Sequence, residues 1–219
     1  MARTHHVLGV ALLHESDFAA ARDAFDQALK RDPSHADTWV NRGVALRELD
    51  DIAGAENSYR QALAIAPNDA VAINNLANVV GTQGRLDEAV ALYRQAVALD
   101  PAYVEAKANL GMALRDAGHA DEALAMLKDA VAAHPGHGAL LNAYGNTLRQ
   151  AERIDEAITV LESAVEHAPN HAEAHNNLGL AYALAGKLDD AALHLKRAAA
   201  LKPSSPVINN NLGALALRK

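Results

Sequence analysis

Apolar residues recur along the chain at the three-to-four-residue spacing of an amphipathic helix, and the apolar stripes come in pairs. In residues 70–103, one stripe ends at Val80 and a second begins at Leu86. The polar segment between them contains Gly84, a residue that suits a tight turn. The pattern therefore predicts two short helices joined by a turn in this segment.

Prolines divide the chain at a constant interval of 34 residues. Six of the seven follow it: Pro33, Pro67, Pro101, Pro135, Pro169 and Pro203. Because proline stops a helix, each marks the end of the second helix of a pair. With these prolines at position 32, the repeats are 2–35, 36–69, 70–103, 104–137, 138–171 and 172–205, followed by a terminal helix in 206–219.

Small residues occupy the same repeat positions throughout. Position 8 is Gly9, Gly43, Ala77, Gly111, Gly145, Gly179 and Gly213. Alanine fills position 20 and position 27 of every complete repeat. Small side chains allow two helix backbones to approach closely, so leucine in place of Ala123 should overpack its repeat.

These positions resemble the tetratricopeptide repeat, whose 34-residue pattern is W-x2-L-G-x2-Y, then A-x3-F, A and P. The second repeat carries the pattern in Trp39, Gly43, Leu46, Ala55, Tyr59, Ala62 and Pro67. The resemblance implies an all-α fold, a right-handed α-α superhelix (solenoid) of six units plus a C-terminal helix, forming a single array over residues 1–219. It also implies a concave groove lined by the first helix of each repeat.

Composition narrows the classes of function. Aromatic residues make up only 4% of the chain, which disfavours a β-rich fold, and no apolar stretch is long enough to cross a membrane. The absence of cysteine excludes disulfides and thiol catalysis and is compatible with the cytoplasm, the expected location. The formal net charge of −7 has the wrong sign for gripping nucleic acid.

Asparagine dominates the residues expected to face the groove. Position 6 contributes Asn41, Asn75, Asn109, Asn177 and Asn211; position 5 contributes Asn74, Asn142, Asn176 and Asn210; position 9 contributes Asn78 and Asn146. Asparagine is a poor residue for a helix interior, so its repeated use in one register calls for a reason. A carboxamide offers a donor and an acceptor, which can pair with the backbone of an extended peptide.

The position-6 column resembles the asparagine ladder of the O-GlcNAc transferase repeat domain, which holds extended peptides. The ladder is interrupted by Val7 and Ala143. An alternative remains open: the asparagines hydrogen-bond neighbouring helices or water, and recur because the repeats duplicated.

Charged ligands are not favoured by the groove residues. Chaperone adaptors of this family grip an acidic C-terminus with lysine and arginine where this chain has Asn74, Ala139 and Ala143. The remaining groove charges balance, with Arg3, Arg47, Arg115, Arg149 and Arg218 against Asp37, Glu48, Glu105, Asp116 and Glu173.

Catalytic and metal chemistry find no support in the motifs. His171 and His175 share a helical spacing, but no third ligand is implied and His175 stands in the packing position of Trp39. No nucleophile stands at an interpretable spacing from a base, and no phosphate-binding glycine loop is present. We therefore expect no catalytic residue, metal or cofactor.

These observations predict a non-enzymatic scaffold that binds an extended protein segment in its asparagine-lined groove. Two alternatives stay open. The array is the substrate-recruiting part of a larger enzyme, such as an O-GlcNAc-transferase-like glycosyltransferase, or a structural scaffold that self-associates. Self-association is suggested by the apolar residues of the C-terminal helix, Ile208, Leu212, Leu215 and Leu217.

Overall fold

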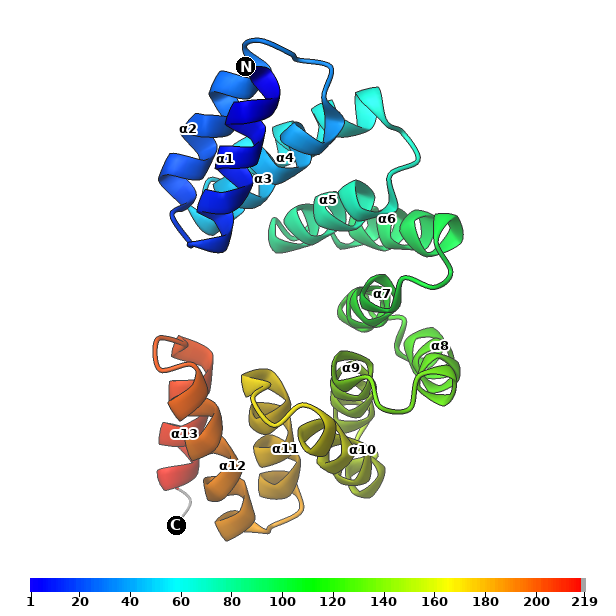
Figure 1. Cartoon of the computed structure of the whole chain (residues 1–219). Coiled ribbons are helices and arrows are strands. Elements are labelled where there is room, and N and C mark those ends of the chain that lie inside the picture. The colour runs from blue at the N-terminus through cyan, green and yellow to red at the C-terminus, as the bar shows by residue number, and fades with distance from the viewer. Residues whose placement is uncertain (218–219) are drawn as a thin grey trace. The chain divides into compact units, whose positions relative to one another are not determined.

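The computed structural model describes residues 1–217, and within them it contains helices and turns but no strand (Figure 1). The helices are α1 (Ala2–His14), α2 (Phe18–Leu29), α3 (Ala36–Glu48), α4 (Ile52–Ile65), α5 (Ala70–Thr82), α6 (Leu86–Leu99), α7 (Val104–Asp116), α8 (Ala120–Ala133), α9 (Gly138–Gln150), α10 (Ile154–His167), α11 (Ala172–Leu184), α12 (Leu188–Leu201) and α13 (Pro206–Ala216). Each 34-residue segment holds two helices, which confirms the all-α fold of paired helices.

The helices form two compact groups, which meet in the sequence inside α7. The N-terminal group covers residues 1–106 and the C-terminal group begins at residue 107. In the first group, Phe25 of α2 packs with Ala45 of α3 and with apolar residues of α1. In the second, a continuous apolar cluster runs from Leu148 of α9 to Leu215 of α13. The prediction of one array over the whole chain stays a prediction.

One residue in each turn between paired helices adopts a left-handed conformation, always at position 15. It is glycine in three repeats: Gly84, Gly118 and Gly186. It is Ser16, Asp50 or Glu152 in the others, with φ between 60° and 63°. The N–H of the next residue reaches back to the first helix, as Arg85 N–H does to the Val80 carbonyl at 3.3 Å, which closes the helix in a Schellman arrangement.

Side chains at position 34 cap the first helix of the following repeat. Asp69 accepts hydrogen bonds from the N–H groups of Val71 and Ala72. Histidine does the same through Nδ1 in three repeats, at 3.3 Å for His35, 3.4 Å for His137 and 3.0 Å for His171. These three histidines therefore have a structural role that satisfies the open N–H groups at a helix start.

The glycines at position 8 lie directly against a bulky residue at position 24 of the paired helix. A Cβ on Gly9 would stand 2.5 Å from the Phe25 ring, and a Cβ on Gly145 would stand 2.5 Å from Leu161 Cγ. Gly43, Gly111 and Gly179 meet Tyr59, Leu127 and Leu195 in the same way. Position 8 is therefore small because the second helix fills the space where a side chain would go.

Two tyrosines at position 24 differ in their hydroxyl groups. Tyr93 donates to Oδ1 of Asn78 at 2.6 Å. The Tyr59 hydroxyl is buried and has no hydrogen-bond partner among residues 1–217, and burial raises the pKa of Tyr59 to about 12. A buried polar group without a partner loses its hydration without compensation.

The C-terminal helix α13 turns three apolar residues inward, while Val207 is 65% exposed. Ile208 packs against Ala172 and Ala198, and Leu215 is buried in the large cluster of the C-terminal group. Leu212 is partly buried against the same cluster, whereas Leu217 is 91% exposed. Three of the four residues that suggested self-association therefore contribute to the core.

His175 of α11 and His194 of α12 form a stacked pair with their Nδ1 atoms 3.0 Å apart. The His175 Nε2 lies 3.1 Å from the Pro169 carbonyl, which accepts only from a protonated nitrogen. In the neutral tautomer that follows, His175 Nδ1 accepts and His194 Nδ1–H donates. Burial lowers the pKa of both rings, and the neighbouring His175 lowers the pKa of His194 further.

Replacing Gly145 by alanine should destabilise the protein by about 1–3 kcal/mol, because the new Cβ overlaps Leu161. Gly213 provides a matched control at the same repeat position, since no neighbouring atom lies within 4 Å of its Cβ site. There, alanine should keep or raise stability through its better helix propensity. Urea unfolding of both variants measures the difference, and equal midpoints would contradict the packing explanation.

Replacing Tyr59 by phenylalanine should raise the free energy of unfolding by about 1 kcal/mol, because it removes a buried hydroxyl that has no partner. Tyr93→Phe is the matched control, since it breaks the bond to Asn78 and should lower stability. The two urea midpoints should move in opposite directions. A decrease for Tyr59→Phe would show that its hydroxyl is satisfied in solution.

Stability should fall as the pH drops below about 6.5, the ordinary pKa of histidine, because the folded pair of His175 and His194 binds protons less readily than the unfolded chain. Above that pH both histidines are neutral in the folded and in the unfolded chain, so their contribution to stability does not change with pH. His194→Phe keeps a ring in the stack but cannot titrate. Urea midpoints at pH 7.5 and 5.5 should therefore differ less in this variant than in the unmodified protein; equal differences would assign the acid sensitivity to other histidines.

Candidate peptide-binding surface

The ten asparagines predicted to bind a ligand all lie on the first helices of their repeats. They are Asn41 in α3, Asn74, Asn75 and Asn78 in α5, Asn109 in α7, Asn142 and Asn146 in α9, Asn176 and Asn177 in α11, and Asn211 in α13. Their burial and hydrogen bonds differ between positions 5, 6 and 9. The asparagines that look alike in the sequence therefore have different roles at these three positions.

Asn74, Asn142 and Asn176 at position 5 are buried and bonded within the protein, whereas Asn210 at the same position is exposed. Asn177 Nδ2 donates to Oδ1 of Asn142 at 2.9 Å, and Asn211 Nδ2 donates to Oδ1 of Asn176 at 2.9 Å. Both bonds join position 6 of one repeat to position 5 of the preceding one. Asn74 Nδ2 donates to the Tyr103 hydroxyl at 3.2 Å. Asn142 and Asn176 thus link neighbouring repeats through side-chain amides, whereas the bond from Asn74 to Tyr103 lies within residues 70–103.

The asparagines at position 9 also have partners within their own group of helices. Asn78 accepts from the Tyr93 hydroxyl in α6. Asn146 accepts from Nε and Nη2 of Arg149 at 3.2 and 2.7 Å. Their carbonyl oxygens are therefore already engaged, which weakens the prediction that Asn78 and Asn146 bind a ligand.

In the N-terminal group, the position-6 asparagines have unused amides. Asn41 of α3 and Asn75 of α5 are half-buried, and neither side chain forms a hydrogen bond within residues 1–217. Helices α3 and α5 contact each other directly. Asn41 lines a hollow of about 310 Å³ together with Asp37 of α3 and Val71 of α5. This surface offers amide donors and acceptors to an external ligand.

In the C-terminal group, the position-6 asparagines are more engaged. Asn109 is half-buried, and Asn177 is buried. Asn211 is half-buried and lines a cavity of about 230 Å³ whose wall also includes Arg149. No sequence pattern reveals this cavity, because its residues come from helices far apart in the chain.

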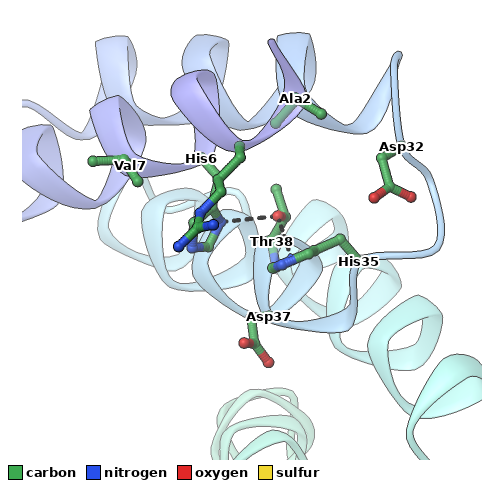
Figure 2. Close-up of a pocket in the computed structure, with 9 residues that line it drawn as sticks. Ala2, His6, Val7, Asp32, His35, Asp37 and Thr38 are labelled. Carbon is green, nitrogen blue, oxygen red and sulfur yellow. Dashed lines mark hydrogen bonds between the residues drawn. The ribbon is translucent and has the colours of Figure 1, made fainter.

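A larger hollow, of about 620 Å³, lies between α1 and the start of α3 in the N-terminal group (Figure 2). There the Thr38 hydroxyl lies 2.9 Å from Nδ1 of both His6 and His35, whose rings are 4.9 Å apart. Burial, followed by the neighbouring His35, lowers the pKa of His6, while Asp37 opposes that shift. The hollow is lined by both polar and apolar residues, and the Thr38 hydroxyl bridges its two histidines.

Within residues 1–217, no three or more histidine, aspartate or glutamate side chains are grouped so that they could hold a metal ion. In the same part of the chain, none of the helices combines the length and apolar character needed to cross a membrane. Arg218, counted among the groove charges, lies outside the described residues.

Several solved structures share this fold. The chain superposes on the type IV pilus biogenesis factor PilW with a TM-score of 0.80 and 24% identity, covering 98% of both chains. It matches the anaphase-promoting-complex hetero-tetramer Cut9–Hcn1 with a TM-score of 0.83 and 18% identity, covering 98% of this chain and 43% of that one. For YrrB, "a TPR protein with an unusual peptide-binding site", the TM-score is 0.57 and the identity 23%, over 86% of this chain and 97% of that one. At such identities the likeness shows the fold alone.

No curated protein sequence matches the chain. Two sequence profiles described as tetratricopeptide repeat do match, one over residues 6–70 and 142–206 and the other over residues 82–146. Together they cover most of the chain, in agreement with the paired helices and with the small residues at positions 8, 20 and 27. The chain therefore belongs to the tetratricopeptide repeat family.

Proposed function

We propose that this protein is a non-catalytic scaffold that binds an extended segment of another protein through amides on the first helices of its repeats. The observation that carries the proposal is the state of Asn41 and Asn75, which are half-buried and form no side-chain hydrogen bond within residues 1–217. Asparagine in a helix interior costs several tenths of a kcal/mol relative to alanine. No internal bond offsets that cost at these two positions.

An extended peptide supplies the missing partners. Its backbone offers N–H and C=O groups along its length, and each carboxamide can accept from one and donate to the other. Asn41 and Asn75 occupy the same repeat position on two contacting helices, so they present equivalent amides along a common surface. YrrB, a TPR protein of the same fold with an unusual peptide-binding site, supports binding of this kind.

Recognition of the peptide main chain also explains why binding does not require an excess of charged residues in the groove. Backbone pairing fixes an extended segment without reading its side chains, so affinity does not depend on a strongly charged groove. The resemblance of position 6 to the O-GlcNAc transferase ladder supports the same mode for Asn41 and Asn75. For Asn142 and Asn176, the internal bonds favour a role in joining repeats.

The double variant Asn41→Ala/Asn75→Ala should weaken peptide binding by about tenfold or more, since each lost neutral hydrogen bond is worth about 1 kcal/mol. The probes are fluorescein-labelled peptides selected from a phage-displayed random library on the full chain, with affinity measured by fluorescence anisotropy. Helicity, followed by circular dichroism, should stay unchanged because neither side chain bonds within the described structure.

Asn57→Ala is the matched control, because Asn57 is exposed on α4, the second helix of its repeat. It should leave affinity unchanged. If the double variant binds every selected peptide as tightly as the unmodified chain, the asparagine surface of the N-terminal group is not the binding site. If no peptide is selected at all, binding of extended segments is refuted.

A further inference from the structure

We propose that the cavity beside Arg149 holds a large apolar side chain of the bound segment, while Arg149 binds an aspartate or glutamate side chain of the same segment. The inference rests on the proposed function and names the ligand chemistry of one part of the surface. The cavity is open to solvent and is lined by residues of α9, α11, α12 and α13, all within the C-terminal group.

The walls of the cavity are mostly apolar. Leu180 and Leu184 of α11, Leu195 of α12 and Leu215 of α13 contribute to it. Leu195 and Leu215 are buried, whereas Leu184 is 55% exposed. A volume of about 230 Å³ suits one large side chain rather than a whole small-molecule ligand. Filling it with leucine, methionine or phenylalanine would remove apolar surface from water on both sides.

Arg149 gives this apolar cavity a positive edge. Its Nε and Nη2 donate to the neutral amide oxygen of Asn146, and no carboxylate in residues 1–217 forms an ion pair with it. Burial, followed by the nearby charge of Arg115, lowers the pKa of Arg149, although a guanidinium stays protonated in proteins. A half-buried cation without a counter-charge favours an incoming anion.

Arg115 strengthens the positive potential. Its guanidinium pairs with Asp116 at 2.7 Å, but its Nη1 is buried and has no hydrogen-bond partner among the described residues. Arg47, at the same repeat position in the N-terminal group, pairs with Glu48 at 2.7 Å. Equal numbers of positive and negative residues in the groove therefore do not mean that each arginine is paired with a carboxylate. Among the three arginines at this repeat position, Arg149 is the one whose guanidinium forms no ion pair with a carboxylate in residues 1–217.

Asn211 indicates how the segment passes the cavity. Its Nδ2 donates to Asn176, which fixes the amide and leaves its carbonyl oxygen able to accept from a peptide N–H. In an extended segment, residues i and i+2 point to the same side. The apolar and acidic side chains should therefore be separated by one residue. Backbone pairing at Asn211 favours an internal segment, and so a side-chain carboxylate rather than a chain terminus.

The test uses the full chain and the same phage-displayed peptide library. Selected peptides should be enriched in an aspartate or glutamate two residues from a leucine, methionine or phenylalanine. Arg149→Met should weaken their binding by about tenfold or more, as expected for a charge-assisted hydrogen bond. Replacing the peptide's acid by its amide should cause a similar loss in the unmodified chain and little further loss in Arg149→Met. Leu184→Ala should weaken the same peptides.

Arg153→Met is the matched control, because Arg153 is exposed on the same group of helices and pairs with Glu156. It should bind normally. Circular dichroism and urea unfolding verify that each variant is folded.

The outcomes separate this inference from the proposed function. Peptides that respond to Asn41→Ala/Asn75→Ala but bind Arg149→Met at full strength, or lack the acidic residue, overturn the Arg149 site and leave the proposed function standing. Failure to select any peptide overturns both. A dimer of the unmodified chain in sedimentation, lost in Leu184→Ala, would assign the cavity to a second copy and also overturn the inference.

Discussion

The close approach of two helices at position 8 is the constraint on which each repeat depends. The residue at position 24 occupies the space of a side chain at position 8, as Phe25 does over Gly9 and Leu161 over Gly145. This contact requires a small residue on the first helix and a bulky one on the second, and it therefore sets the orientation of the pair. Because the face that carries position 8 packs against the second helix, positions 6 and 12 of the first helix face outward or contact the neighbouring repeat.

Much of this fold is predictable from the sequence, because the 34-residue spacing of prolines and the small residues at position 8 are direct consequences of packing. The turns show where sequence reasoning stops. Gly84 signals a left-handed residue, but Ser16 and Glu152 adopt the same conformation with no such signal. A left-handed conformation costs a non-glycine residue about 1 kcal/mol, which the helix-closing hydrogen bond and the packing of both helices overcome. Context therefore decides the backbone at these positions.

The candidate site is predictable only as a set of residues, because the sequence does not show where an amide finds its partner. Asn75 and Asn74 are adjacent in the chain, yet Asn74 is buried against Tyr103 and Asn75 has no side-chain partner within residues 1–217. The spacing of 35 residues that joins Asn142 to Asn177 becomes meaningful only when neighbouring first helices are packed together. In the same way, counting charges predicts neutrality but does not reveal that Arg149 is left without a carboxylate.

Position 12 shows how an array of similar repeats comes to differ from one repeat to the next. The core positions repeat because each helix pair solves the same packing problem, so they carry little information about a partner. Position 12 is less tied to that demand, although Leu13 and Ala183 pack against core clusters. It varies, with Leu13, Arg47, Gly81, Arg115, Arg149, Ala183 and Leu217 in successive units. Even the three arginines at this position differ in whether a carboxylate neutralises them. Glu48 pairs with Arg47 and Asp116 with Arg115, whereas no carboxylate in residues 1–217 pairs with Arg149. Under the proposed function, specificity would arise where one repeat lacks the compensating neighbour that the others have.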